Sequence, residues 1–253
     1  MKRQKIVFTT ASKVEFHEDL FEDKIDSPHE IIVKNRYSMV SAGTELACLS
    51  GVESWFPLPG TPGYLSVGEV IAKGSAVDHL ELGDLVYVFG PHASVFKIDI
   101  SCRWGGMNIK VPDGLRQDMA PFARMASIAI TGVRMSGIEL GDDVAIAGLG
   151  AIGNFAAQQA RLQGANVICF DVSEKRIELA KKCGLENAFN SNGKDIVEGI
   201  RSRTDGRGVS TLIDATGSAA LIESMMPAVS LYGEVILVGS PRAPYQTNLT
   251  KML

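Results

Sequence analysis

A glycine pattern, Gly-x-Gly-x-x-Gly at residues 148–153, constrains the fold of this chain more than any other feature. The apolar run Val144–Ala147 comes directly before it, and the helical pattern Gly153–Leu162 follows. The first glycine permits a tight turn, the second lets the backbone approach a pyrophosphate, and the third allows the helix to pack closely on the strand. Free N–H groups at the start of the helix favour phosphate. This context predicts a dinucleotide-binding loop. Its residues are Gly148, Gly150, Ala151, Ile152 and Gly153.

Asp171 stands 18 residues after the last glycine, at the end of the apolar run Asn166–Phe170. A carboxylate there accepts the hydroxyls of an adenosine ribose and repels a 2′-phosphate, which favours NAD over NADP. Arg176, one helical turn further, would tolerate such a phosphate. Two structural alternatives stay open: a glycine turn without nucleotide, and an Asp171 that only caps the next helix.

Apolar runs and helical patterns alternate through the second half of the chain, which predicts β-α-β units and a parallel sheet. The expected strands are 144–147, 166–170, 188–190, 211–214 and 234–238, and the expected helices are 117–136, 153–162, 173–182, 195–203 and 219–230. Ligands of such sheets bind at the carboxyl ends of strands. Thr216 follows one of these strands and Val238 ends another, so we expect both near the nicotinamide, although plain turns would look similar.

Residues 1–115 read as short strands separated by dense Gly, Pro and Asp turn signals. The clearest strand patterns are Lys5–Phe8, Glu30–Val33, Gly68–Ala72 and Leu85–Phe89. This half is expected to form a distorted β-barrel or sandwich. The sequence therefore predicts two domains, residues 1–127 and 128–253.

Composition excludes several classes of protein. The chain has 25 Lys and Arg against 29 Asp and Glu in 253 residues, so it lacks the basic excess of a nucleic-acid binder. No apolar stretch reaches the length of a membrane span, and Glu15 follows the basic N-terminus too soon for a signal peptide. The four cysteines form no Cys-x-x-Cys pair, which argues against a disulfide framework or zinc cluster. A cytoplasmic location is expected.

Five segments, in this order, resemble those of the medium-chain dehydrogenase/reductase family. They are Ser41–Leu46, Pro59–Val70, Gly83–Val86, Val111–Leu115 and residues 148–153. The resemblance covers nearly the whole chain. It implies an α/β protein in which a β-rich GroES-like domain precedes a Rossmann domain with a doubly wound parallel sheet. It also implies hydride transfer between a nicotinamide cofactor and a small-molecule substrate.

The chain departs from the zinc-dependent members of that family at each position where they place a metal ligand. Ala42 replaces a cysteine, Tyr64 and Leu65 replace a His-Glu pair, and Arg124 replaces an acidic or cysteine ligand. Alanine, leucine and arginine do not ligate zinc. We therefore expect neither catalytic nor structural zinc.

The resemblance implies two candidate catalytic residues. Thr44 stands at the hydroxyl of the family's proton relay, and Ala47 replaces the histidine that ends it. Tyr64 stands at a ligand position, from which its phenol would reach a substrate oxygen. The alternatives are that Tyr64 only fills the vacated metal pocket and that Thr44 is a helix N-cap. No acid is evident beside His92, for which a structural hydrogen bond is expected.

Ser-Ala-Gly-Thr-Glu at 41–45 and Phe-Gly-Pro-His-Ala at 89–93 resemble a zinc-lacking branch. That branch includes proteins similar to 2-desacetyl-2-hydroxyethyl bacteriochlorophyllide dehydrogenase. The predicted function is a zinc-independent, NAD(P)-dependent oxidoreductase acting on a small alcohol or carbonyl compound. An NADPH-dependent quinone or enone reductase and an inactive dinucleotide-binding protein stay open as alternatives.

The length adds one further expectation. Only five strands are predicted in the second half, whereas the doubly wound dinucleotide fold has six. Family members continue past the fifth strand, so the resemblance implies a chain truncated at its C-terminus and an incomplete Rossmann domain. In the family the sixth strand often builds a homodimer, so a homodimer of this chain stays open as a possibility without that strand.

Overall fold

The computed structural model describes residues 1–102 and 106–241. The chain divides into two compact units, Met1–Arg124 and Met125–Leu253. Each unit is described by itself below. No helix within the described ranges is both long enough and apolar enough to cross a membrane.

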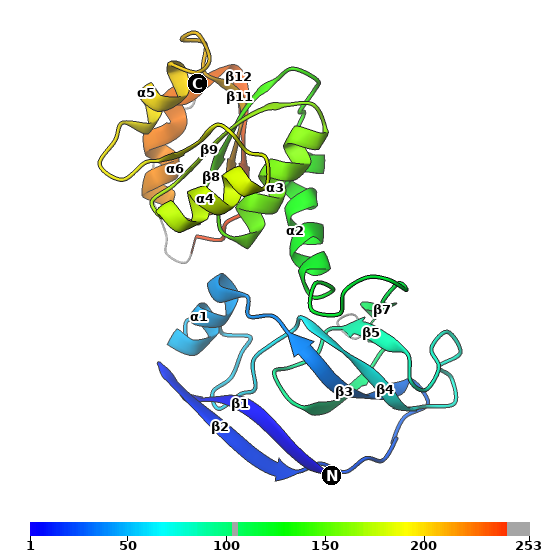
Figure 1. The fold of residues 1–253 in the computed structure, drawn as a ribbon. Coiled ribbons are helices and arrows are strands. Elements are labelled where there is room, and N and C mark those ends of the chain that lie inside the picture. Colours follow the sequence, from blue (N-terminus) through cyan, green and yellow to red (C-terminus); the bar gives the residue numbers. More distant parts are fainter. Residues whose placement is uncertain (103–105, 242–253) are drawn as a thin grey trace. The chain divides into compact units, whose positions relative to one another are not determined.

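The first unit is built from antiparallel strands (Figure 1). Its elements are β1 (Lys2–Thr10), β2 (Lys13–Leu20), β3 (Glu30–Ser38), α1 (Ala42–Ser50), β4 (Ser66–Lys73), β5 (Leu85–Val88), β6 (Val95–Asp99) and β7 (Asn108–Lys110). Strands β1 and β2 form a hairpin, and the other five form a sheet in the order β6-β3-β4-β5-β7. Side chains alternate across such a sheet. Ile31, Val33, Val70, Val86 and Val88 therefore share one buried cluster.

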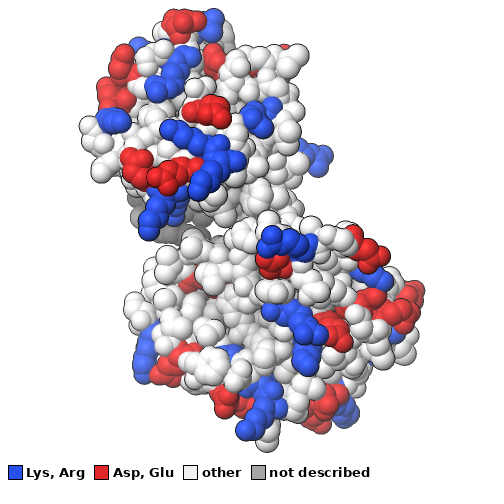
Figure 2. Space-filling model, viewed as in Figure 1, with Lys and Arg blue, Asp and Glu red and all other residues white. Residues whose placement is uncertain are grey.

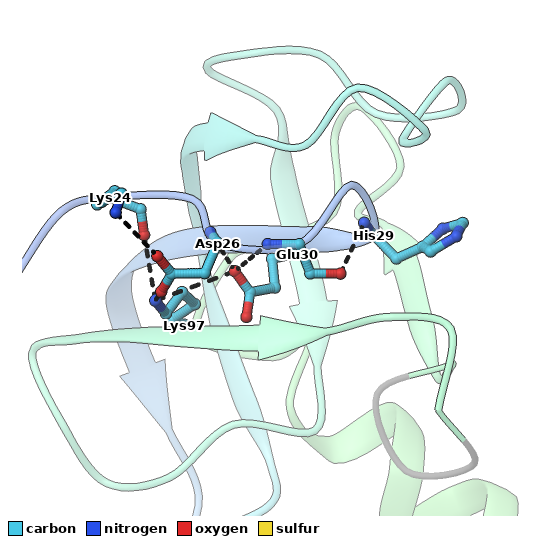
Figure 3. Close-up of polar contacts among 6 residues, drawn as sticks. Lys24, Asp26, His29, Glu30 and Lys97 are labelled. Carbon is cyan, nitrogen blue, oxygen red and sulfur yellow. Dashed lines mark hydrogen bonds and ion pairs between the residues drawn. The ribbon is translucent and has the colours of Figure 1, made fainter.

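Hydrogen bonds and an ion pair connect the segment before β3 to β6 (Figure 3). The ammonium group of Lys97 on β6 contacts the Asp26 carboxylate and donates to the carbonyl of Lys24 at 3.1 Å. Glu30, at the start of β3, accepts a hydrogen bond from the Asp26 backbone N–H at 2.8 Å. These contacts fix the connection between the hairpin and the sheet.

The second unit is a parallel sheet flanked by helices. Its elements are α2 (Phe122–Met135, which begins before the division), β8 (Asp143–Ala147), α3 (Ala151–Leu162), β9 (Asn166–Asp171), α4 (Glu174–Lys182), β10 (Ala188–Asn190), α5 (Ile196–Arg201), β11 (Val209–Asp214), α6 (Ala219–Met225), a 3-10 turn (Met226–Ala228) and β12 (Val229–Leu237). The strand order is β10-β9-β8-β11-β12. The chain therefore starts in the middle of the sheet and winds outward in both directions, which places a topological switch point after β8.

Successive side chains of β8 point to opposite faces of this sheet, so they contribute to two separate core clusters. Val144 and Ile146 pack in one cluster with residues of α2, α3 and α4. Ala145 and Ala147 face the other way, in a cluster with residues of α5 and α6. Both faces are covered by helices, as a parallel sheet requires. The predicted α/β class, with an antiparallel first half and a doubly wound second half, is confirmed.

Candidate functional site

The turn between β8 and α3 needs glycine at two of its three glycine positions. Gly148 has φ +85, a conformation that L side chains rarely adopt. A Cβ on Gly153 would lie 1.8 Å from the Gly148 carbonyl oxygen, so only glycine lets the first turn of α3 pack on the loop. Gly150 differs, because its φ is −62 and no atom lies within 4 Å of the position of its missing Cβ. The loop therefore leaves open space at Gly150.

That space adjoins the N-terminus of α3, which follows Gly150 directly. In the described part of the chain, no side chain caps this helix end. The first N–H groups of a helix have no acceptor within the helix, and the helix dipole places partial positive charge there. The loop thus offers donors and open space together, which suits an anionic ligand.

Asp171, the last residue of β9, ties the glycine turn to the neighbouring strand. Its Oδ2 accepts a hydrogen bond from the Leu149 backbone N–H at 2.7 Å, and its Oδ1 accepts one from Ser173 N–H at 2.8 Å. The Arg176 guanidinium approaches Oδ2 at 3.3 Å. The carboxylate is buried, while Arg176 is 56% exposed. Asp171 and Arg176 therefore lie together beside the turn.

The ends of β11 and β12 meet around a fully buried carboxylate, that of Asp214. It accepts hydrogen bonds from the N–H and hydroxyl of Thr216 at 3.0 and 2.5 Å, and from Gly217 N–H at 2.9 Å. The Asp214 carbonyl accepts from Val238 N–H at 2.9 Å. The Thr216 methyl carbon lies 2.8 Å from where a Cβ on Gly148 would stand. The structure thus brings Thr216 against the glycine turn, with Val238 on the next strand end.

Thr44 lies inside α1 and is half-buried. The alternative interpretation of Thr44 as the N-cap is wrong, because Ser41 occupies that position. The Glu45 carboxylate accepts the hydrogen bond of the Ser41 backbone N–H at 2.8 Å, so a later side chain caps this helix end.

Tyr64 packs with aromatic neighbours of the first unit. Its ring stacks on Phe89 with centroids 5.2 Å apart, and its carbonyl accepts a hydrogen bond from the Tyr87 hydroxyl at 3.3 Å. Burial raises the pKa of Tyr87 to about 12, so this phenol stays protonated at neutral pH. Among the described residues, no hydrogen bond joins Tyr64 to Thr44.

The hydrogen bond expected of His92 is present, and one of its partners is an acid that the sequence did not make evident. Its Nε2 lies 2.9 Å from Oε2 of Glu45, and both side chains are buried. Its Nδ1 lies 2.8 Å from the Ser38 hydroxyl. These three residues come from the end of β3, from α1 and from the loop after β5. No fixed spacing along the chain signals their meeting.

The residues at the expected metal positions do not form a metal site. Within residues 1–102 and 106–241, no group of three or more His, Cys, Asp or Glu side chains is arranged to hold a metal ion. Ala42 and Leu65 offer no donor atom, and the Arg124 guanidinium is a cation. These side chains do not fit zinc.

Comparisons with known proteins agree with the fold. Residues 151–253 match the model of a zinc-binding dehydrogenase family. A zinc-type alcohol dehydrogenase-like protein of Haemophilus influenzae is 28% identical over 240 residues, covering 84% of this chain and 70% of that protein. The D-guloside 3-dehydrogenase of Escherichia coli K12 is 30% identical over 177 residues, covering 70% of this chain and 50% of the enzyme.

Among solved structures, the zinc dependent alcohol dehydrogenase 2 from Streptococcus pneumonia superposes with a TM-score of 0.86 at 21% identity. The match covers 98% of this chain and 79% of that one. The likeness extends through both units of the fold. These comparisons support the resemblance to the medium-chain dehydrogenase/reductase family, with alcohol dehydrogenase-like relatives.

Proposed function

We propose that the protein is a zinc-independent, NAD-linked oxidoreductase that transfers hydride between nicotinamide and a small alcohol or carbonyl substrate. The glycine turn carries this proposal. The space where a Cβ of residue 150 would stand is open and lies beside the uncapped start of α3. In the proposed function this space takes the pyrophosphate of the dinucleotide. The backbone donors of α3 would hold its charge.

The Asp171 carboxylate supports NAD as the preferred dinucleotide. A carboxylate has about four acceptor positions. Leu149, Ser173 and Arg176 occupy three of them, so one is left for a ribose hydroxyl. A 2′-phosphate would instead meet a buried negative charge.

A nicotinamide dinucleotide supplies the hydride-transfer chemistry when it is bound. The protein's task is then to orient the substrate and to hold the charge that develops on its oxygen. With no zinc ligands at the expected positions, we assign this task to hydroxyl donors, Thr44 and Tyr64. The packing of Tyr64 on Phe89 fixes its ring in place, which favours a positioned donor.

One observation favours a rival function, an NADPH-dependent quinone or enone reductase. Arg176 is exposed beside Asp171, where it would pair with a 2′-phosphate after leaving the carboxylate. The Arg176–Asp171 contact of 3.3 Å is long for a charge-assisted hydrogen bond, so this release is inexpensive.

The proposal includes small-molecule substrates, no nucleic-acid partner and a cytoplasmic location. Lys and Arg are interspersed with Asp and Glu over the face seen in Figure 2, without a field of one sign. The formal net charge of −4 agrees with this pattern. The face seen in this view therefore carries no basic patch of the kind that attracts a nucleic acid or another polyanion.

Fluorescence titration with NADH and NADPH tests the proposal, combined with metal analysis of the purified protein. We expect tighter binding of NADH and no stoichiometric zinc. Tighter binding of NADPH would move the assignment to the quinone or enone reductase. One zinc per chain would overturn the zinc-independent mechanism. Cofactor binding without turnover of alcohols, ketones or enones would favour a dinucleotide-binding protein without activity.

A further inference from the structure

A second constellation of reactive groups lies in the first unit, apart from the glycine turn. The side chains of Glu45 and His92 are 7% and 8% exposed, and their Oε2 and Nε2 atoms are 2.9 Å apart. The other Glu45 oxygen accepts the Ser41 backbone N–H. A carboxylate engaged as an acceptor on both sides requires a donor at Nε2, so His92 carries its proton there.

The opposite ring nitrogen is consequently an acceptor. When Nε2 of a neutral imidazole is protonated, Nδ1 has a free lone pair. The Ser38 hydroxyl lies 2.8 Å from Nδ1, and with this neutral tautomer it is the hydroxyl that donates. Hydroxyl, imidazole and carboxylate thus stand in the order nucleophile, base and orienting acid, the arrangement that activates serine in acyl-transfer enzymes.

We propose that Ser38 is an activated nucleophile that accepts acyl groups from small neutral esters. Three features distinguish it from a hydroxyl that only satisfies a buried histidine. Ser38 is exposed, whereas His92 and Glu45 behind it are buried. Gly63 packs directly on His92, with its missing Cβ position 2.6 Å from His92 N and 3.0 Å from Cγ, so the imidazole is held in place. The hydroxyl also opens onto a groove.

The groove has a volume of about 290 Å³, and both Ser38 and His92 line it. Its lining mixes polar and apolar side chains, and Ile6, Phe16 and Tyr37 provide apolar surface for a short acyl chain. Its two cationic side chains are already paired with acids.

Lys5 binds Asp19 at 2.7 Å, and Arg36 binds Glu69 at 2.7 Å. Neither cation is left to attract an anionic ligand, since each charge is balanced locally. The groove therefore favours a neutral ester over a charged one.

The acyl transfer balances without any added cofactor. The Ser38 oxygen forms a bond to the ester carbonyl carbon while Nδ1 of His92 takes the hydroxyl proton. The bond from that carbon to the leaving oxygen then breaks, and the leaving group departs as an alcohol with the same proton. Water repeats the sequence on the acylated serine and releases the acid. Glu45 stabilises the imidazolium that forms between these steps.

A fluorophosphonate probe and p-nitrophenyl acetate test this site in the intact chain. We expect the probe to label Ser38 at one group per chain, located by peptide mass spectrometry. In Ser38→Ala this label disappears, and p-nitrophenol release falls by about 100-fold or more, because the nucleophile that the base activates has been removed. Ser75→Ala is the matched control, because Ser75 is an exposed serine of the same unit and is not among the residues that line the groove. Its labelling and release should match the wild type.

Glu45→Gln distinguishes a Ser38 that the His92–Glu45 pair activates from a Ser38 that reacts only because it is exposed. It keeps the size of the side chain but removes the negative charge, so the labelling rate should fall by about tenfold or more if the carboxylate supports the base. Labelling at other residues only, or equal rates in wild type, S38A and E45Q, would overturn the proposal. NADH titration of S38A is a separate readout and should match the wild type, because Ser38 lies outside the dinucleotide loop.

Discussion

The backbone N–H of Leu149 donates a 2.7 Å hydrogen bond to Oδ2 of Asp171. Leu149 lies between the first two glycines of the turn, and Asp171 ends the neighbouring strand. One carboxylate thus shapes the loop and, in the proposed function, would also bind the ribose. Replacing Asp171 would disturb both roles, so other residues give cleaner tests of the site.

Gly153→Ala should destabilise the second unit strongly. The added Cβ would lie 1.8 Å from the Gly148 carbonyl oxygen and 3.1 Å from the Ala215 Cβ, so the helix must move away from the loop. Overpacking of this kind costs about 1–3 kcal/mol or more. Urea unfolding measures the loss, and an unchanged midpoint would show that α3 does not pack on the turn as described.

Asp214→Asn should also lower stability, although it preserves the side-chain shape. The fully buried Asp214 carboxylate is surrounded by hydrogen-bond donors, among them the N–H groups of Thr216 and Gly217. An asparagine amide would turn its own N–H group towards one of these donors, which would then lose its acceptor. Leaving such a group unsatisfied costs about 1–3 kcal/mol. Asp195→Asn is the matched control, since Asp195 is an exposed N-cap of α5 and asparagine caps equally well. Equal thermal midpoints for the two variants would contradict the prediction.

Arg176→Ala tests the basis of cofactor preference. If Arg176 accepts a 2′-phosphate, its removal should weaken NADPH binding by about tenfold, equivalent to 1.4 kcal/mol, and leave NADH binding within about twofold. Lys175→Ala removes the same charge from the adjacent, exposed position of α4 and serves as control. If R176A lost affinity for NADH and NADPH equally, the role of Arg176 would be structural, through its contact with Asp171.

The β1–β2 hairpin should lose stability in acid. Hydrogen bonds from Arg3, and then from Lys5, hold the pKa of Asp19 well below its ordinary value of 3.8. A carboxylate whose pKa is depressed by folding stabilises the protein fully above its unfolded pKa, and this contribution is lost as the pH falls from there through the lower pKa of the folded state. Asp19→Asn should therefore be less stable than the wild type at pH 6, with the difference vanishing in acid. Asp23→Asn, at an exposed position, should show no comparable trend.

The second unit could be predicted from sequence because its strands are buried on both faces. Val144–Ala147 is an uninterrupted apolar run, and the glycine turn after it has one common structural meaning. The helix predicted over 117–136 begins later, at Phe122, directly after Pro121. The strand predicted from Glu234 begins five residues earlier, at Val229. The prediction missed this part because Tyr232-Gly233 resembles a turn, and Tyr232, with φ 63, indeed interrupts the regular strand conformation.

The first unit was harder to predict because its strands are short and partly exposed. Strand β2 (Lys13–Leu20) carries charged residues beside apolar ones that are exposed, namely Val14, Phe16 and Leu20. Ser12 takes φ 62 in the hairpin turn without the Asn-Gly or Asp-Gly signal that such turns usually carry. The Glu45–His92 contact joins residues 47 positions apart, and only the folded chain brings them together.

Calorimetric titration of NADH into wild type and Gly150→Ala tests the central claim most directly. Alanine fits Gly150 in the free protein, where φ is −62 and no atom lies within 4 Å of the new Cβ, so folding should be unaffected. Gly137→Ala, at another roomy glycine of the same unit, is the control. We predict that NADH binds the wild type and G137A alike and binds G150A about tenfold more weakly or worse, since a misplaced methyl group costs about 1–3 kcal/mol. Equal affinity in G150A, or no binding by the wild type, would contradict the dinucleotide site.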